Sequence, residues 1–132
     1  MTGPRQDATE VVRLFHGWDD SAIWFPDPLP YGESGLSPGL IEDLIAWDEG
    51  HYAGLTDHED HRPVAVRRDS ATVGVQLARR LAGEIGDGFV VEVDAVDGSD
   101  PLRLRAPGPA RNPEAAATFR RLATQTRAER AC

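Results

Sequence analysis

The sequence predicts one α+β domain over residues 1–132, in which a small, mainly antiparallel sheet is packed by three helices. Three observations predict this class. Segments 37–54 and 70–86 repeat apolar residues at a helical period, and segment 113–130 does so with a narrower apolar stripe. Between the last two helices, residues 89–106 change to the two-residue period of a strand hairpin. Helices and a sheet combined in this way can bury their apolar faces against one another in two layers.

The first predicted element is a strand over residues 10–16. Val11, Leu14 and Phe15 would also fit a helical stripe, so the segment is ambiguous by periodicity alone. The run is short, begins with β-branched residues and ends at Gly17. These features favour a strand that joins the sheet.

Residues 26–39 follow as a loop, because they contain four prolines and three glycines. Prolines fix the backbone angle φ and remove amide donors, so the loop should have a restricted shape. Three aromatic side chains in or beside it are expected to be partly exposed: Trp24, Phe25 and Tyr31.

The helix 37–54 begins with a strong start signal. Ser37 is a good N-cap, and Pro38 suits the first helical position. The inner face is expected to consist of Leu40, Ile41, Leu44, Ile45 and Trp47. Four acidic residues are expected to face water: Glu42, Asp43, Asp48 and Glu49.

The helix 70–86 should begin at a cap formed by Asp69 or Ser70, after a polar loop over 56–68. Its apolar stripe consists of Val73, Leu77, Ala78, Leu81, Ala82 and Ile85. Gly86 provides the left-handed residue that commonly ends a helix. The stripe therefore predicts a helix that packs on the sheet along one face.

The hairpin 89–106 is predicted with Phe89, Val91, Val93 and Ala95 facing inward. If its loop comprises residues 97–100, Glu92 lies opposite Arg105 and Asp94 opposite Arg103 on the outer face. Val93 then meets Leu104 on the inner face. Apolar burial would decide which face is inside, and the opposed charges would select the register.

The last helix, 113–130, has Asn112 as a cap, Pro113 at its first position and Glu114 in its first turn. Its apolar stripe is narrow. We therefore expect this helix to be the most loosely docked element.

Composition restricts the possible functions. The chain has a net charge of −8, and all fourteen basic residues are arginine. A lysine nucleophile or Schiff base is therefore excluded. Residues 1–66 hold three arginines and thirteen acidic residues, so the negative charge is concentrated in this half. This distribution predicts a basic protein partner and argues against nucleic-acid binding.

The cytoplasm is the predicted location. The sequence starts without the pattern of a secretory signal, and no apolar run reaches the length of a membrane span. The lone cysteine, Cys132, cannot form a disulfide within the chain, which fits a reducing compartment. No cofactor is predicted.

The leading functional hypothesis is a non-enzymatic protein-binding module, for instance an immunity or antitoxin-like protein that masks a basic partner. Acidic residues would attract the partner, and aromatic residues would anchor it. The candidate partner-binding residues are Glu42, Asp43, Asp48, Glu49, Trp24, Tyr31 and Tyr52.

The alternative is a small-molecule-binding protein or enzyme that uses the loop from His51 to His61 beside the aromatic segment 24–31. Within this loop, His51, His58 and His61 are candidate metal ligands, because imidazoles close in sequence can converge on one ion. The spacing of a known zinc motif is missing. No catalytic residue is assigned, since no pairing of a nucleophile with a base is recognisable.

The segments that run from Gly35 to Trp47, from Leu77 to Ala82 and from Gly86 to Val91 give the chain a family resemblance. Over roughly residues 10–95 it resembles small acidic proteins of unknown function from actinobacteria. The second hairpin strand and the last helix depart from that group. The resemblance implies no catalytic residues and no activity.

Overall fold

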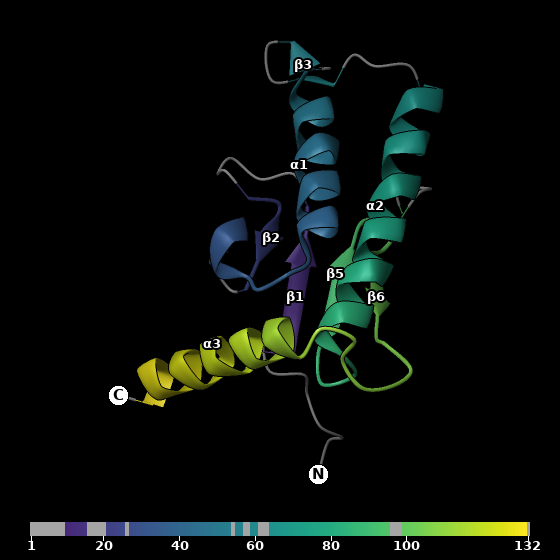
Figure 1. The fold of residues 1–132 in the computed structure, drawn as a ribbon. Coiled ribbons are helices and arrows are strands. Elements are labelled where there is room, and N and C mark those ends of the chain that lie inside the picture. The colour runs from purple at the N-terminus through teal and green to yellow at the C-terminus, as the bar shows by residue number, and fades with distance from the viewer. Residues whose placement is uncertain are drawn as a thin grey trace.

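The computed structural model describes residues 10–15, 21–25, 27–53, 55–56, 59–60, 64–95 and 99–131. Its elements follow in the order β1 (Val11–Leu14), β2 (Ile23–Trp24), η2 (Tyr31–Glu33), α1 (Pro38–Ala53), β3 (Leu55–Thr56), β4 (Glu59–Asp60), α2 (Val64–Ile85), β5 (Val90–Val93), β6 (Leu102–Leu104) and α3 (Pro113–Ala131). Helices α1 and α2 lie side by side on one face of the sheet, and α3 lies near one end of it (Figure 1). The predicted α+β class is confirmed.

The main sheet has the strand order β2-β1-β5-β6. The strand predicted over 10–16 is confirmed as β1. Its pairing with β5 is parallel, whereas the other two pairings are antiparallel, so the sheet is mixed rather than purely antiparallel. The reason is that α1 and α2 lie between β1 and β5 in the chain, and such a long crossover is what a parallel pair requires.

The hairpin is confirmed, but its predicted register is wrong by two residues. Val93 lies opposite Leu102, and Val91 lies opposite Leu104. A slip of two residues leaves every side chain on the same face, so the apolar alternation could not distinguish the two registers. Of the predicted turn residues 97–100, residues 97 and 98 are outside the described residues.

The open face of the sheet carries a charged row across three strands. Arg13, Glu92 and Arg103 lie directly opposite one another on β1, β5 and β6. Glu92 Oε2 lies 3.1 Å from Arg13 Nε, and its Oε1 lies 3.4 Å from Arg103 Nε. Opposite charges face one another on this side of the sheet, as predicted. The partner of Glu92 differs from the prediction: it is Arg103 rather than Arg105.

Helix α1 starts at its predicted cap, whereas α2 starts before its predicted caps. α1 begins at Pro38, and the Leu40 amide donates to Ser37 Oγ over 3.4 Å, so Ser37 is the predicted N-cap. α2 begins at Val64, six residues before the prediction, and Asp69 and Ser70 therefore lie inside the helix rather than capping it. Pro63 directly precedes Val64 in the sequence, and a proline at a helix start was a usable signal.

The core confirms most of the predicted apolar faces, including Phe89, Val91 and Val93 on the hairpin. Three predicted positions are wrong. Val73 and Ile45 are 41% and 37% exposed, whereas Phe25 is buried. Gly74 faces α1 in place of Val73, because a Cβ built there would lie only 2.8 Å from Trp47 Cζ2. Gly74 rather than Val73 therefore lies against Trp47 of α1.

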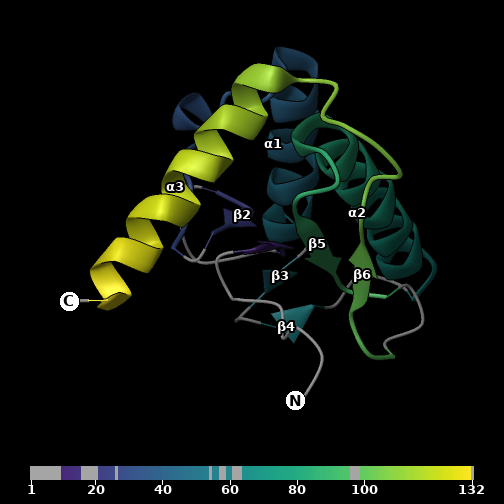
Figure 2. The same cartoon turned by 90° about the horizontal axis from the view of Figure 1, so that it is seen from below.

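Helix α3 enters the core through one aromatic side chain. Phe119 is fully buried, and its ring lies 5.3 Å from that of Phe25 and 5.9 Å from that of Phe89. Seen from below, the C-terminal turns of α3 extend away from the other elements (Figure 2). Asn112 Oδ1 accepts from the Ala115 amide over 3.2 Å, which confirms the predicted cap. Loose docking of α3 stays a prediction.

Replacing Gly86 by alanine is expected to destabilise the protein, whereas Gly83→Ala is expected to stabilise it. Gly86 has φ +86°, and an added Cβ would lie 2.7 Å from the Ala110 nitrogen. The left-handed backbone alone costs roughly 1–2 kcal/mol for a residue with a side chain. Gly83 lies inside α2 with nothing within 4 Å of an added Cβ, so alanine should gain up to about 1 kcal/mol. Urea unfolding measures both, and equal shifts would contradict this account.

Candidate partner-binding surface

The four acidic residues predicted to bind a partner occupy different faces of α1. Glu42 and Glu49 are seven residues apart, so they share one outward face with the partly exposed Ile45. Asp43 is exposed on the side toward α2. Asp48 is only 8% exposed, which corrects the expectation that it faces water. Its position four residues after Leu44 places it on the buried face of the helix. We call Glu42, Ile45 and Glu49 the acidic ridge.

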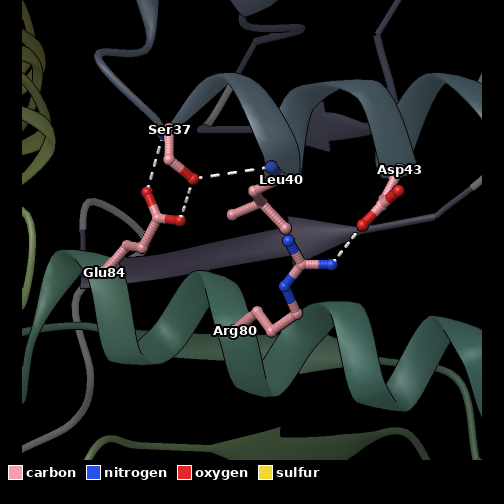
Figure 3. Close-up of polar contacts among 5 residues, drawn as sticks. All are labelled: Ser37, Leu40, Asp43, Arg80 and Glu84. Carbon is pink, nitrogen blue, oxygen red and sulfur yellow. Dashed lines mark hydrogen bonds and ion pairs between the residues drawn. The ribbon is translucent and has the colours of Figure 1, made fainter.

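Asp43 is paired with an arginine from the same chain. Arg80 on α2 donates to Asp43 Oδ2 over 2.5 Å, and both side chains are about half exposed (Figure 3). An exposed pair of this kind contributes at most about 1 kcal/mol. Asp43 is therefore partly neutralised before any partner arrives. The acidic ridge keeps its two carboxylates without an ion pair among the described residues.

A groove of about 620 Å³ lies between α1 and α2 beside this ridge. We call it the α1–α2 groove. Its lining includes the apolar groups of Ala46, Trp47, Val73 and Leu77. Asp43, Asp69 and Arg80 also line it, so the charged lining residues carry a net negative charge. Trp47 is held in place because its Nε1 donates to the Ser70 carbonyl over 2.8 Å.

The aromatic candidates have structural contacts of their own. Trp24 is half-buried and stacks on Phe15, with ring centroids 5.1 Å apart. Among the described residues, its Nε1 has no hydrogen-bond partner. The Tyr31 hydroxyl accepts from the Ala22 amide over 3.0 Å. Tyr52 belongs to α1, but its side chain is outside the described residues.

Burial raises the pKa of the Tyr31 hydroxyl above its usual value of 10.0, and the negative charge of Asp48 raises this pKa further. The structure thus brings together two of the predicted site residues, Tyr31 and Asp48, on the inner side of α1. Tyr31 is neutral at physiological pH. The pair forms part of the internal packing rather than an exposed anchor.

A polar link that sequence reasoning missed joins the starts of two helices to the end of α2. Glu84 Oε1 accepts from the Ser37 amide over 2.8 Å and from Asn112 Nδ2 over 3.0 Å. Glu84 Oε2 accepts from Ser37 Oγ over 2.5 Å (Figure 3). A carboxylate near two helix N-termini is electrostatically favourable. The caps Ser37 and Asn112 were recognisable, but nothing local indicated that Glu84 joins them.

The histidine candidates cannot be placed as a site. His58 and His61 are outside the described residues, and for His51 only the backbone, within α1, is described. Among the residues whose placement is described, no group of three or more histidine, cysteine, aspartate or glutamate side chains could hold a metal ion. The alternative site beside the segment 24–31 therefore stays a prediction.

Comparison with known proteins does not assign the chain to a family. No family model matches the chain, and neither a curated protein nor a solved structure matches it. In the described part of the chain, each helix is too short or too polar to cross a bilayer. The fold and the α1–α2 groove therefore define the molecule as an α+β protein with a candidate binding surface on its helical side.

Proposed function

We propose that this protein is a non-enzymatic binding module whose α1–α2 groove and acidic ridge receive a basic segment of another protein. An immunity or antitoxin-like role, in which the acidic surface masks a basic partner, is the form that we favour. The observation that carries the proposal is the groove itself, with Trp47, Val73 and Leu77 beside the carboxylates of Asp43 and Asp69. A cytoplasmic location accords with the single cysteine.

The chemistry of the groove specifies the partner. Apolar side chains would enter between the helices, and Lys or Arg residues on the same segment would meet the carboxylates of the groove and the ridge. Apolar anchors supply most of the binding free energy in protein interfaces, whereas charges raise the association rate and fix the orientation. The partner segment should therefore alternate apolar and basic residues, and its association should slow as salt concentration rises.

Two sets of variants test the proposal by affinity purification from the native host, followed by kinetic measurement with the protein recovered. Glu42→Lys combined with Glu49→Lys is expected to slow association at least about tenfold at low salt, because steering changes rates by 10-fold or more. Val73→Arg places a long cation in the groove at an exposed helical position and is expected to abolish binding. Circular dichroism should show that both variants fold.

The control is Asp94→Lys combined with Glu129→Lys, which changes the net charge equally at two exposed positions away from the groove. This variant is expected to bind with nearly unchanged kinetics. If the control and the ridge variant slow association equally, only the net charge matters and the site assignment is wrong. Retention of the partner by Val73→Arg would also refute the groove as the binding site.

A further inference from the structure

A second groove gathers positive charge on an acidic protein. It encloses about 660 Å³ between α2, β6 and the segment 105–111 that leads to α3. Half of its ten lining residues are arginines: Arg79, Arg80, Arg103, Arg105 and Arg111. The described residues that complete the lining are Ala82, Gly83, Leu104, Ala106 and Pro107, of which none is acidic or aromatic. We call this feature the arginine groove.

Internal contacts occupy only part of the donors in this groove. Arg80 pairs with Asp43, Arg103 pairs with Glu92, and Arg105 Nη1 donates to the Asp87 carbonyl over 2.7 Å. A guanidinium has five N–H donors, so Arg80 and Arg105 retain donors for a ligand. The guanidinium groups of Arg79 and Arg111 have neither an ion pair nor a hydrogen bond to any described residue.

Gathering arginines in one groove is electrostatically unfavourable, and the protein does not need this cluster for its solubility. Arg80 and Arg103 are paired with carboxylates, but the like charges of Arg79, Arg105 and Arg111 around one groove repel one another. The chain carries a net charge of −8, so it needs no basic cluster to stay soluble. Arginines on a solvated surface usually alternate with acidic residues. Glu84, which follows the lining residue Gly83 in the sequence, accepts from Ser37 and Asn112 rather than from these arginines.

We infer that the arginine groove binds a compact ligand that carries several phosphate groups. The planar fork of a guanidinium matches phosphate oxygens with two parallel hydrogen bonds. The volume lies within the range of small-molecule sites. Without an aromatic side chain among its described lining residues, the groove offers no platform on which bases of single-stranded nucleic acid would stack. The net charge disfavours a long polyanion. This site shares Arg80 with the α1–α2 groove, but it does not depend on the proposed protein partner.

Calorimetric titration with sodium tripolyphosphate at low salt tests the inference. The test variant combines Arg79→Gln with Arg111→Gln, because these two side chains hold no described contact whose loss would disturb the fold. Each substitution should weaken binding about tenfold, which corresponds to about 1.4 kcal/mol, because it removes a charge-assisted hydrogen bond to phosphate. The control combines Arg120→Gln with Arg121→Gln, which removes the same charge from exposed positions on α3. The control should bind as the unmodified protein does.

Binding that is lost in the Arg79 and Arg111 variant and kept in the control supports the site. No measurable binding to the unmodified protein overturns it, and so does an equal loss in both variants. If the glutamine variant does not fold, Arg79→Lys with Arg111→Lys keeps the charge and removes the planar guanidinium fork, and weaker binding is again expected.

A second titration with ATP distinguishes the sources of phosphate. Tighter binding than tripolyphosphate indicates a nucleotide, and equal binding indicates an inorganic polyphosphate.

Discussion

Val93→Asp is expected to unfold the protein. Val93 is 4% exposed and lies in β5 between Leu14 of β1 and Leu102 of β6. A carboxylate at this position would be buried without a partner, and an uncompensated buried charge costs about 3–5 kcal/mol or more. The loss reaches the lower end of the stability of an average domain, which is roughly 5–15 kcal/mol. Circular dichroism should therefore show little cooperative melting.

Arg105→Ser is the matched control on the other face of the hairpin. Arg105 is exposed, and its Nη1 donates a hydrogen bond to the Asp87 carbonyl. Removing it should cost about 1 kcal/mol or less. Similar losses of melting temperature in the two variants would mean that apolar burial does not hold this sheet together.

Phe119→Ala is expected to lower the free energy of unfolding by about 3–5 kcal/mol, the usual range for removing a buried aromatic ring. Phe119 is fully buried and is the largest side chain that α3 contributes to the core. Its loss leaves a cavity against Phe25 and Phe89, which come from two other segments of the chain. Urea unfolding measures the change.

Gln125→Ala on the same helix is the control, since Gln125 is exposed and alanine is a good helix former. Its stability should be nearly unchanged. Hydrogen exchange gives a second measurement: amides of α3 should lose protection in Phe119→Ala before those of α2. If Phe119→Ala costs no more than Gln125→Ala, the ring does not anchor α3, and the helix is docked by other contacts.

The long helices and the hairpin could be predicted because the sequence signals that begin, end or define them lie within a few neighbouring residues. The cap at Ser37, the glycine stop at Gly86 and the alternation from Phe89 to Val93 each depend on a few neighbouring residues. The register of the hairpin was not accessible in the same way. Both registers bury the same face, so the apolar alternation does not distinguish them.

The candidate site was predicted in part. Glu42 and Glu49 are exposed as expected, whereas Asp48 is buried and Asp43 meets Arg80. The helical period of α1 alone could have placed Asp48 with Leu44 on the inner face. The pairing of Asp43 could not have been found in this way, because Arg80 is 37 residues further along the chain.

The amino-acid order by itself determined the α+β class, the three long helices, the hairpin and the concentration of acidic residues in the first half. Those properties follow from periodicity, caps and composition, which a linear chain already contains. Only the tertiary structure decided which charges meet, that β1 and β5 run parallel, and that five arginines from α2, β6 and the following segment line one groove. The reason is that such contacts join residues distant in sequence, and the packing of helices on the sheet sets which of them become neighbours.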